Sequence, residues 1–152
     1  MNISYIELKK NQIDEIKPLW EELNNHHGDL STHFPERYDK FSFKDRKKDI
    51  LKKSENGTLR IDIAKDDDTE SNIGYCISSI SDELIGEIDS IYLKEKYRSY
   101  GIGNEFMERS LNWMNEKEVK IKKIVVAVGN EELLSFYEKY GFYPRHIILE
   151  QK

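Results

Sequence analysis

The sequence has only one cysteine and three prolines, and it contains no long apolar run. A single cysteine excludes a disulfide within the chain and is typical of a reducing compartment. No segment approaches the roughly 18 consecutive apolar residues that a membrane-spanning helix needs. The first residues also lack the basic segment and apolar stretch of a secretory signal. We therefore expect a cytoplasmic protein that makes no contact with a membrane.

An excess of positive charge is missing as well. The formal net charge is -5, from 24 Lys and Arg against 29 Asp and Glu. This balance argues against a general nucleic-acid-binding surface and favours a cationic small partner. The length of 152 residues and the hydrophobic content of 38% are those of one globular unit with its own core. We expect a single domain over residues 1–152.

Neither a metal site nor a reactive thiol is indicated. Cys76 lies in an apolar segment that has the pattern of a strand, where a cysteine is usually a small core residue. The histidines of residues 24–42 have no partners at the spacing of a zinc site, so we expect no metal. These residues show no clear period and predict either a long loop or a broken pair of helices. We expect His27 and Phe34 to line a pocket for an acceptor molecule there.

Hydrophobic periodicity predicts a mixture of strands and helices. Alternating apolar residues indicate strands at residues 3–8, 59–63, 73–80 and 84–93. Three- and four-residue intervals indicate helices at residues 14–24, 43–55, which has a lysine-rich face, and 104–116. A β-branched run predicts a strand buried on both faces at residues 124–128. The pattern then predicts a helix from Asn130 to Gly141 and a last strand at residues 146–149. The short strand connections favour antiparallel pairing, so the fold class is α/β with a mostly antiparallel sheet.

A turn with two glycines, residues 98–103, stands between an expected strand and an expected helix. Backbone amides of such a turn converge on a helix N-terminus, where unpaired donors and the helix dipole hold a phosphate group. The dinucleotide-binding fingerprint needs a third glycine, where this chain has Phe106, and the Gly-Lys-Ser/Thr of a P-loop is absent. A glycine pair without further context is more often a plain helix entry than a phosphate site, so the context decides.

That context is a second block, residues 125–142, which reads VVAVGNEELLSFYEKYGF. Together the two blocks resemble the acyl-CoA-binding half of the GNAT superfamily of N-acetyltransferases, and the likeness covers residues 86–144. The resemblance implies a mixed, mostly antiparallel central sheet, flanked by helices and splayed between strands 4 and 5. It also implies acetyl-CoA as co-substrate. The N-terminal half of the chain matches only in the order of its elements.

The resemblance assigns the coenzyme to particular residues. It implies that main-chain groups of Ile91 and Leu93 pair with pantetheine, with an amide of Ile91 or Tyr92 near the thioester oxygen. Residues expected to contact coenzyme in the turn and helix start are Arg98, Ser99, Tyr100, Gly101, Ile102, Gly103 and Asn104. Many relatives carry a basic residue or a glycine where this chain has Ser99 and Tyr100, which predicts weaker binding of the pyrophosphate.

Two further residues of the second block have two interpretations each. Asn130 either caps its helix or uses its amide to hold the pantetheine arm, as the resemblance implies. Tyr137 is either a core aromatic or, as the resemblance implies, the general acid that protonates the leaving thiolate. We expect Tyr137 to contact the coenzyme as well as to act in catalysis.

Transfer of an acetyl group to an amine requires removal of a proton, because an alkyl ammonium is almost fully protonated at neutral pH. Glu87 and Asp89 share one face of the expected strand at residues 84–93. Both could simply face solvent. The resemblance favours Glu87 as the base that also contacts the acceptor, with Asp89 as the reserve.

The sequence therefore predicts direct transfer of an acetyl group from acetyl-CoA to a primary amine. The acceptor is a small molecule or a peptide, and the sequence does not say which. Two alternatives stay open: an acyl-CoA-binding or sensing module without catalysis, and a protein N-terminal or lysyl acetyltransferase. The sequence also leaves open whether the chain forms a homodimer.

Overall fold

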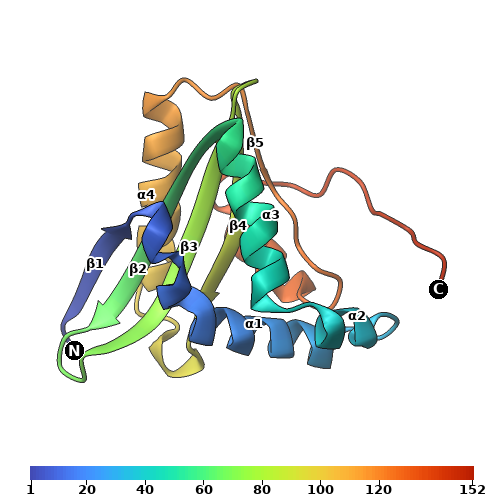
Figure 1. Ribbon diagram of the computed structural model, residues 1–152, viewed down its shortest axis with the longest axis horizontal. Coiled ribbons are helices and arrows are strands. Elements are labelled where there is room, and N and C mark those ends of the chain that lie inside the picture. The colour runs from blue at the N-terminus through green and yellow to red at the C-terminus, as the bar shows by residue number, and fades with distance from the viewer.

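The computed structural model describes residues 1–152 and is built on one five-stranded sheet (Figure 1). The strands follow one another in the order of the chain: β1 (Ile3–Leu8), β2 (Gly57–Asp66), β3 (Ser71–Ser81), β4 (Ile85–Leu93) and β5 (Ile121–Ile124). Each of the first three strands pairs antiparallel with the next, and β5 lies parallel to β4. The predicted class, a mixed and mostly antiparallel sheet flanked by helices, is confirmed.

Five α-helices and three short 3-10 helices complete the chain. The α-helices are α1 (Lys17–Leu30), α2 (Pro35–Lys40), α3 (Phe43–Glu55), α4 (Ile102–Glu116) and α5 (Leu134–Glu138). The 3-10 segments are η1 (Lys10–Ile16), η2 (Glu95–Tyr97) and η3 (Glu131–Leu133). Residues 24–42 thus form a broken pair of helices, one of the two predicted alternatives. None of the helices combines the length and the apolar character needed to cross a bilayer.

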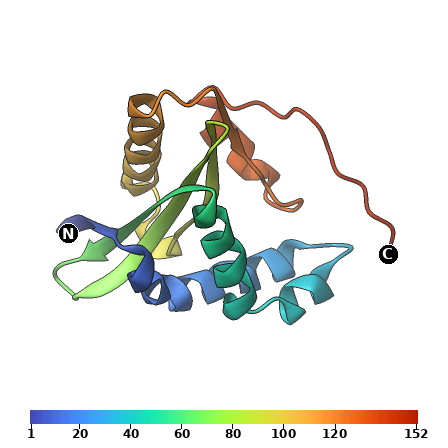
Figure 2. The ribbon, with the colours of Figure 1, turned by 45° about the horizontal axis from the view of Figure 1, so that its top comes forward.

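The sheet separates two apolar cores. Figure 2 shows α1 and α3 on one side of the sheet and α4 on the other. On one face, α1 and α3 bury Trp20 and Ile50 against Ile61, Ile63 and Ile77 of the sheet. The core on the other face holds residues of α4 and α5, with Phe106, Met107, Met114 and Tyr137 packed on Cys76 and Ile88. Alternate residues of each strand therefore serve different cores, as the pleat of a strand requires.

A β-bulge interrupts this alternation in β4. Ile77 pairs with Ser90, while the adjacent Ser78 pairs with Ile88, so Asp89 is an additional residue on β4. A bulge of this kind re-aims side chains and is often found beside functional sites. Here it leaves Ser90 on the α3 side, where its hydroxyl lies 2.7 Å from that of Tyr75.

The sheet opens between β4 and β5. Their pairing ends at Ile88 and Ile124, whereas β4 continues to Leu93. The predicted splay is present, but the strand predicted at residues 124–128 is wrong, because β5 spans Ile121–Ile124. Val125 and Val128 are 74% and 69% exposed, so this β-branched run leaves the sheet and is not buried on two faces.

The last strand, predicted at residues 146–149, is also wrong. After α5 the chain runs away from the sheet without regular structure (Figure 1), and Ile147, Ile148 and Leu149 are 79%, 79% and 90% exposed. The apolar sequence has strand propensity, but the chain places no partner strand beside it. The predicted helix stop is better supported: Gly141 has φ of 84°, and Phe142 N donates to Tyr137 O at 3.2 Å, as in a Schellman motif.

Candidate active site

The two acids of β4 meet the same lysine of α3. Lys53 Nζ lies 3.1 Å from Glu87 Oε2 and also forms an ion pair with Asp89 Oδ1. Lys123 of β5 lies 3.5 Å from the other oxygen of Glu87. The Glu87 side chain is 16% exposed and that of Asp89 is 1% exposed. The acids thus share a face, and they pack against α3 instead of pointing freely into solvent.

Asp89 occupies an unusual environment. Burial raises the pKa of its carboxyl group above the ordinary value, and the neighbouring Lys53 ammonium opposes that rise. One of its oxygens, Oδ2, is buried without a hydrogen-bond partner. Arg46 of α3 fixes the backbone at the same residue by donating from Nη2 to the Asp89 carbonyl at 2.6 Å. The bulge residue is therefore held by two cations while its carboxylate remains incompletely satisfied.

The glycine turn stands just beyond the end of β4. Ser99 and Gly101 have positive φ, 70° and 83°, and Gly101 is the N-cap of α4. The helix begins at Ile102, two residues before the expected start. Glu105 N donates to Gly101 O at 3.0 Å, whereas the turn and cap hydrogen bonds involve no amide of residues 99–104. No atom lies within 4 Å of a Cβ built on Gly101, so the turn faces open space there.

Arg98 joins this turn to the strand. Its Nε donates to Leu93 O at 3.1 Å, and its guanidinium lies 6.0 Å from the centre of the Tyr92 ring. Tyr100, by contrast, is 65% exposed. The expected coenzyme residues of β4 and of the turn are thereby brought next to each other, with Arg98 as the link.

The start of α4 packs on α5. Gly103 leaves room for the Phe136 ring, which lies 3.4 Å from the Cβ position of that glycine. Asn104 Oδ1 accepts hydrogen bonds from the Tyr140 hydroxyl and, at 3.3 Å, from Lys139 Nζ. The side-chain oxygen of Asn104 is therefore used within the protein.

Tyr137 projects from α5 into the core beneath α4. It is 6% exposed, and burial raises the pKa of its hydroxyl to about 12. A raised pKa keeps the hydroxyl protonated at every physiological pH, so it is available as a hydrogen-bond donor. The core role and the predicted acid role of Tyr137 are both compatible with this position.

Asn130 and His27 form a contact that no local pattern in the sequence predicts. Asn130 is 3% exposed and is the N-cap residue of η3, but its side chain makes no capping hydrogen bond; its Nδ2 lies 2.9 Å from His27 Nδ1, although 103 residues separate the two. His27 also lies beside the Tyr38 ring, with centroids 5.6 Å apart. Burial, and to a smaller degree His26, lowers the pKa of His27. One expected coenzyme residue and one expected acceptor residue are thus in direct contact.

Phe34 is placed differently from His27. It lies just before α2, where the guanidinium of Arg37 is 5.2 Å from the centre of its ring. It lines a surface cavity of about 220 Å³ together with Gln151 and Lys152 of the C-terminal tail. The acid pair does not line that cavity.

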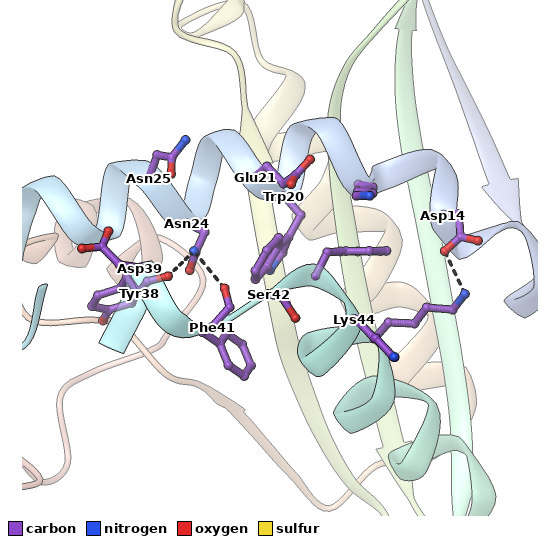
Figure 3. Close-up of a pocket in the computed structure, with 13 residues that line it drawn as sticks. Asp14, Trp20, Glu21, Asn24, Asn25, Tyr38, Asp39, Phe41, Ser42 and Lys44 are labelled. Carbon is purple, nitrogen blue, oxygen red and sulfur yellow. Dashed lines mark hydrogen bonds and ion pairs between the residues drawn. The ribbon is translucent and has the colours of Figure 1, made fainter. Parts of the chain in front are cut away.

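A larger cavity of about 810 Å³ lies between α1, α2 and α3 (Figure 3). Asn24 lines the cavity and donates from Nδ2 to Tyr38 O at 2.7 Å. The Lys47–Asp14 ion pair lies at the other end of the cavity. None of the residues assigned to coenzyme, acceptor or catalysis from the sequence lines it.

Comparison with known proteins places this arrangement in a family. The family model described as "Acetyltransferase (GNAT) family" matches residues 19–142. The chain therefore belongs to the GNAT family of acetyltransferases. An uncharacterized N-acetyltransferase of Methanocaldococcus jannaschii is 22% identical over an alignment of 123 residues, and the match covers 73% of this chain. The match covers 52% of that relative, so the chain spans about half the length of the curated protein that it matches.

Solved structures show the same fold. A putative acetyl transferase from Pyrococcus furiosus superposes with a TM-score of 0.73 at 19% identity, covering 99% of both chains. The PaiA N-acetyltransferase of Thermoplasma acidophilum, solved in complex with coenzyme A, gives a TM-score of 0.70 at 22% identity. It covers 94% of this chain and 91% of its own.

Proposed function

We propose that this protein transfers an acetyl group from acetyl-CoA directly to a primary amine. The observation that carries the proposal is the position of the acid pair, Glu87 and Asp89, at the point where β4 and β5 separate. A relative named as an N-acetyltransferase and a structural neighbour solved with coenzyme A support the same reaction class. The chain matches only about half of the relative from Methanocaldococcus jannaschii. The acceptor is therefore proposed from the residues of this site alone.

The residues present suit a pantetheine arm and a pyrophosphate. Beyond Ile88 the β5 side of β4 has no partner strand, which leaves main-chain groups of Ile91 and Leu93 to pair with an extended ligand. The glycine turn offers amide donors at the N-terminus of a 15-residue helix, where a phosphate is stabilised by the helix dipole. In this proposal, the amide of Ile91 or Tyr92 polarises the thioester carbonyl, and Asn130 contacts the pantetheine arm.

Starting from the acceptor's ammonium group, the reaction removes two protons from nitrogen and supplies one to sulfur. The acceptor's ammonium group gives a proton to Glu87, whose carboxylate is the more accessible of the pair. The neutral nitrogen then attacks the thioester carbonyl carbon, a C–N bond forms, the C–S bond breaks, and the nitrogen releases its second proton to solvent. Tyr137 donates its proton to the departing sulfur and recovers one from solvent.

The role of Tyr137 gives a direct test. Tyr137→Phe keeps the ring that packs beneath α4 but removes the hydroxyl, and we expect kcat to fall by roughly 10²-fold with the KM for acetyl-CoA little changed. Steady-state kinetics measure both constants. Tyr143→Phe is the matched control, because Tyr143 is 69% exposed in the tail. Equal kcat in wild type and Tyr137→Phe would leave this tyrosine with a core role only.

The proposed activity is tested by release of free thiol from acetyl-CoA with a panel of amines: polyamines, aminoglycosides, amino acids and short peptides. Cys76 is fully buried, so it contributes little background to thiol detection by a reagent that needs access. Turnover on one class supports the proposal and identifies the acceptor chemistry. Turnover on peptides alone indicates the protein acetyltransferase. Binding of acetyl-CoA without turnover on any amine contradicts the proposal and favours the sensing module.

A further inference from the structure

Lys53 is the one side chain that contacts both acids of the site. It comes from α3, and it bridges Glu87 Oε2 at 3.1 Å and Asp89 Oδ1. The Lys53 side chain is 42% exposed, whereas those of the acids are 16% and 1% exposed. Its ammonium group therefore lies between the buried acids and solvent. A substrate amine that approaches Glu87 from solvent meets this ammonium group.

Other ionisable groups surround the pair from each neighbouring element. Besides Lys53, α3 contributes Arg46, which binds the Asp89 carbonyl, and β5 contributes Lys123, 3.5 Å from Glu87. From β3, Tyr75 and Cys76 lie close by; burial keeps both neutral, since it raises the pKa of each far above the physiological range. Lys53 is the only one of these groups whose side chain forms an ion pair with the Asp89 carboxylate.

Two carboxylates that share one site cannot both remain ionised without a compensating charge. Asp89 is nearly fully buried and has one oxygen without a partner, so the loss of its counter-charge would be costly. Removal of the Lys53 charge would thus make the pair retain a proton at neutral pH. A pair that already holds a proton is a poor acceptor for the proton of an amine.

We propose that Lys53 is a positioning residue that keeps the Glu87–Asp89 pair ionised and so determines the pH above which the enzyme is active. This inference rests on the proposed acetyl transfer, because it assigns the base of that reaction to the pair. When the acceptor binds, its ammonium group takes over one of the contacts of Lys53. The half-exposed lysine side chain then turns toward solvent.

The test compares three variants of α3. Lys53→Met removes the charge and keeps the length of the side chain, Lys53→Arg keeps the charge, and Lys52→Met is the control, because Lys52 is exposed and adjacent in sequence. We expect the acidic side of the kcat/KM profile to move up by about 1–3 pH units in Lys53→Met alone. Activity of that variant should recover at high pH, which damage to the fold would not allow.

A second measurement is independent of turnover. Carboxyl ¹³C NMR follows the titration of Glu87 and Asp89 in wild type and in Lys53→Met, and the apparent pKa values of the pair should be higher in the variant. An unchanged titration and an unchanged pH profile would overturn the inference. A wild-type protein inactive on every amine would contradict the proposed function instead, and the NMR titration would still decide the role of Lys53.

Discussion

Replacing Glu87 by glutamine is expected to lower kcat by about 10²–10⁴-fold, the usual contribution of a general base. Glutamine has the same shape and still accepts a hydrogen bond from Lys53, but it cannot take a proton from the acceptor's ammonium group. The coenzyme is assigned to the edge of β4 beyond the bulge and to the glycine turn, so the KM for acetyl-CoA should change little. Steady-state kinetics with saturating amine measure the loss.

Two companion variants make this result specific. Asp89→Asn alters the buried partner of the pair, and Glu83→Gln alters an exposed acid in the turn before β4. We expect Glu83→Gln to behave as wild type. If Asp89→Asn loses activity while Glu87→Gln stays within a factor of two of wild type, Asp89 is the base and the assignment of Glu87 is wrong. Full activity in both variants would remove the pair from the mechanism.

Local signals predicted the parts of the fold that are determined locally. The glycine turn precedes α4 as expected, because the positive φ at Gly101 and the start of the helix both depend on residues close together in the sequence. Gly141 ends its helical segment for the same reason. The alternation of apolar residues located β1 to β4, since each of these strands has different surroundings on its two faces.

The errors concern pairing between strands, which local propensity does not determine. Residues 124–128 are the most β-branched run of the chain, yet the pairing with β4 uses Ile121–Ile124, which include Lys122 and Lys123. Lys123 is accommodated because it reaches Glu87, its register partner on β4. Residues 146–149 have strand propensity and no partner. Propensity describes how well a residue fits a pleated surface, so it needs a neighbouring strand to act on.

The site shows the same division. The acids, the glycine turn and Tyr137 could be named from motifs, but the residues that determine their surroundings could not. Lys53 belongs to a helix with many lysines, and only the tertiary fold brings that one to Asp89, 36 residues away. The contact between His27 and Asn130 spans 103 residues. A motif marks where chemistry can occur, whereas charges from distant elements decide how each group ionises.

Substitution of Arg60 by methionine is expected to lower the free energy of unfolding by about 3–5 kcal/mol, because it leaves a buried carboxylate without its counter-charge. Asp62 of β2 is fully buried, and Arg60 donates to both of its oxygens, from Nε at 2.7 Å and from Nη2 at 3.1 Å. Arg60 also lies 3.5 Å from Glu7 of β1. Denaturation by urea, followed by circular dichroism, measures the change.

Two comparisons show whether the unpaired charge causes this loss. Arg109→Met breaks a surface ion pair with Glu105; the two side chains are 33% and 37% exposed. This change should lower the free energy of unfolding by about 1 kcal/mol or less. The double variant Arg60→Met, Asp62→Leu removes both charges from the interior and should recover most of the lost stability, since a buried ion pair is often replaceable by apolar residues. A double variant as unstable as Arg60→Met alone would mean that packing of the arginine, and not its charge, stabilises this part of the sheet.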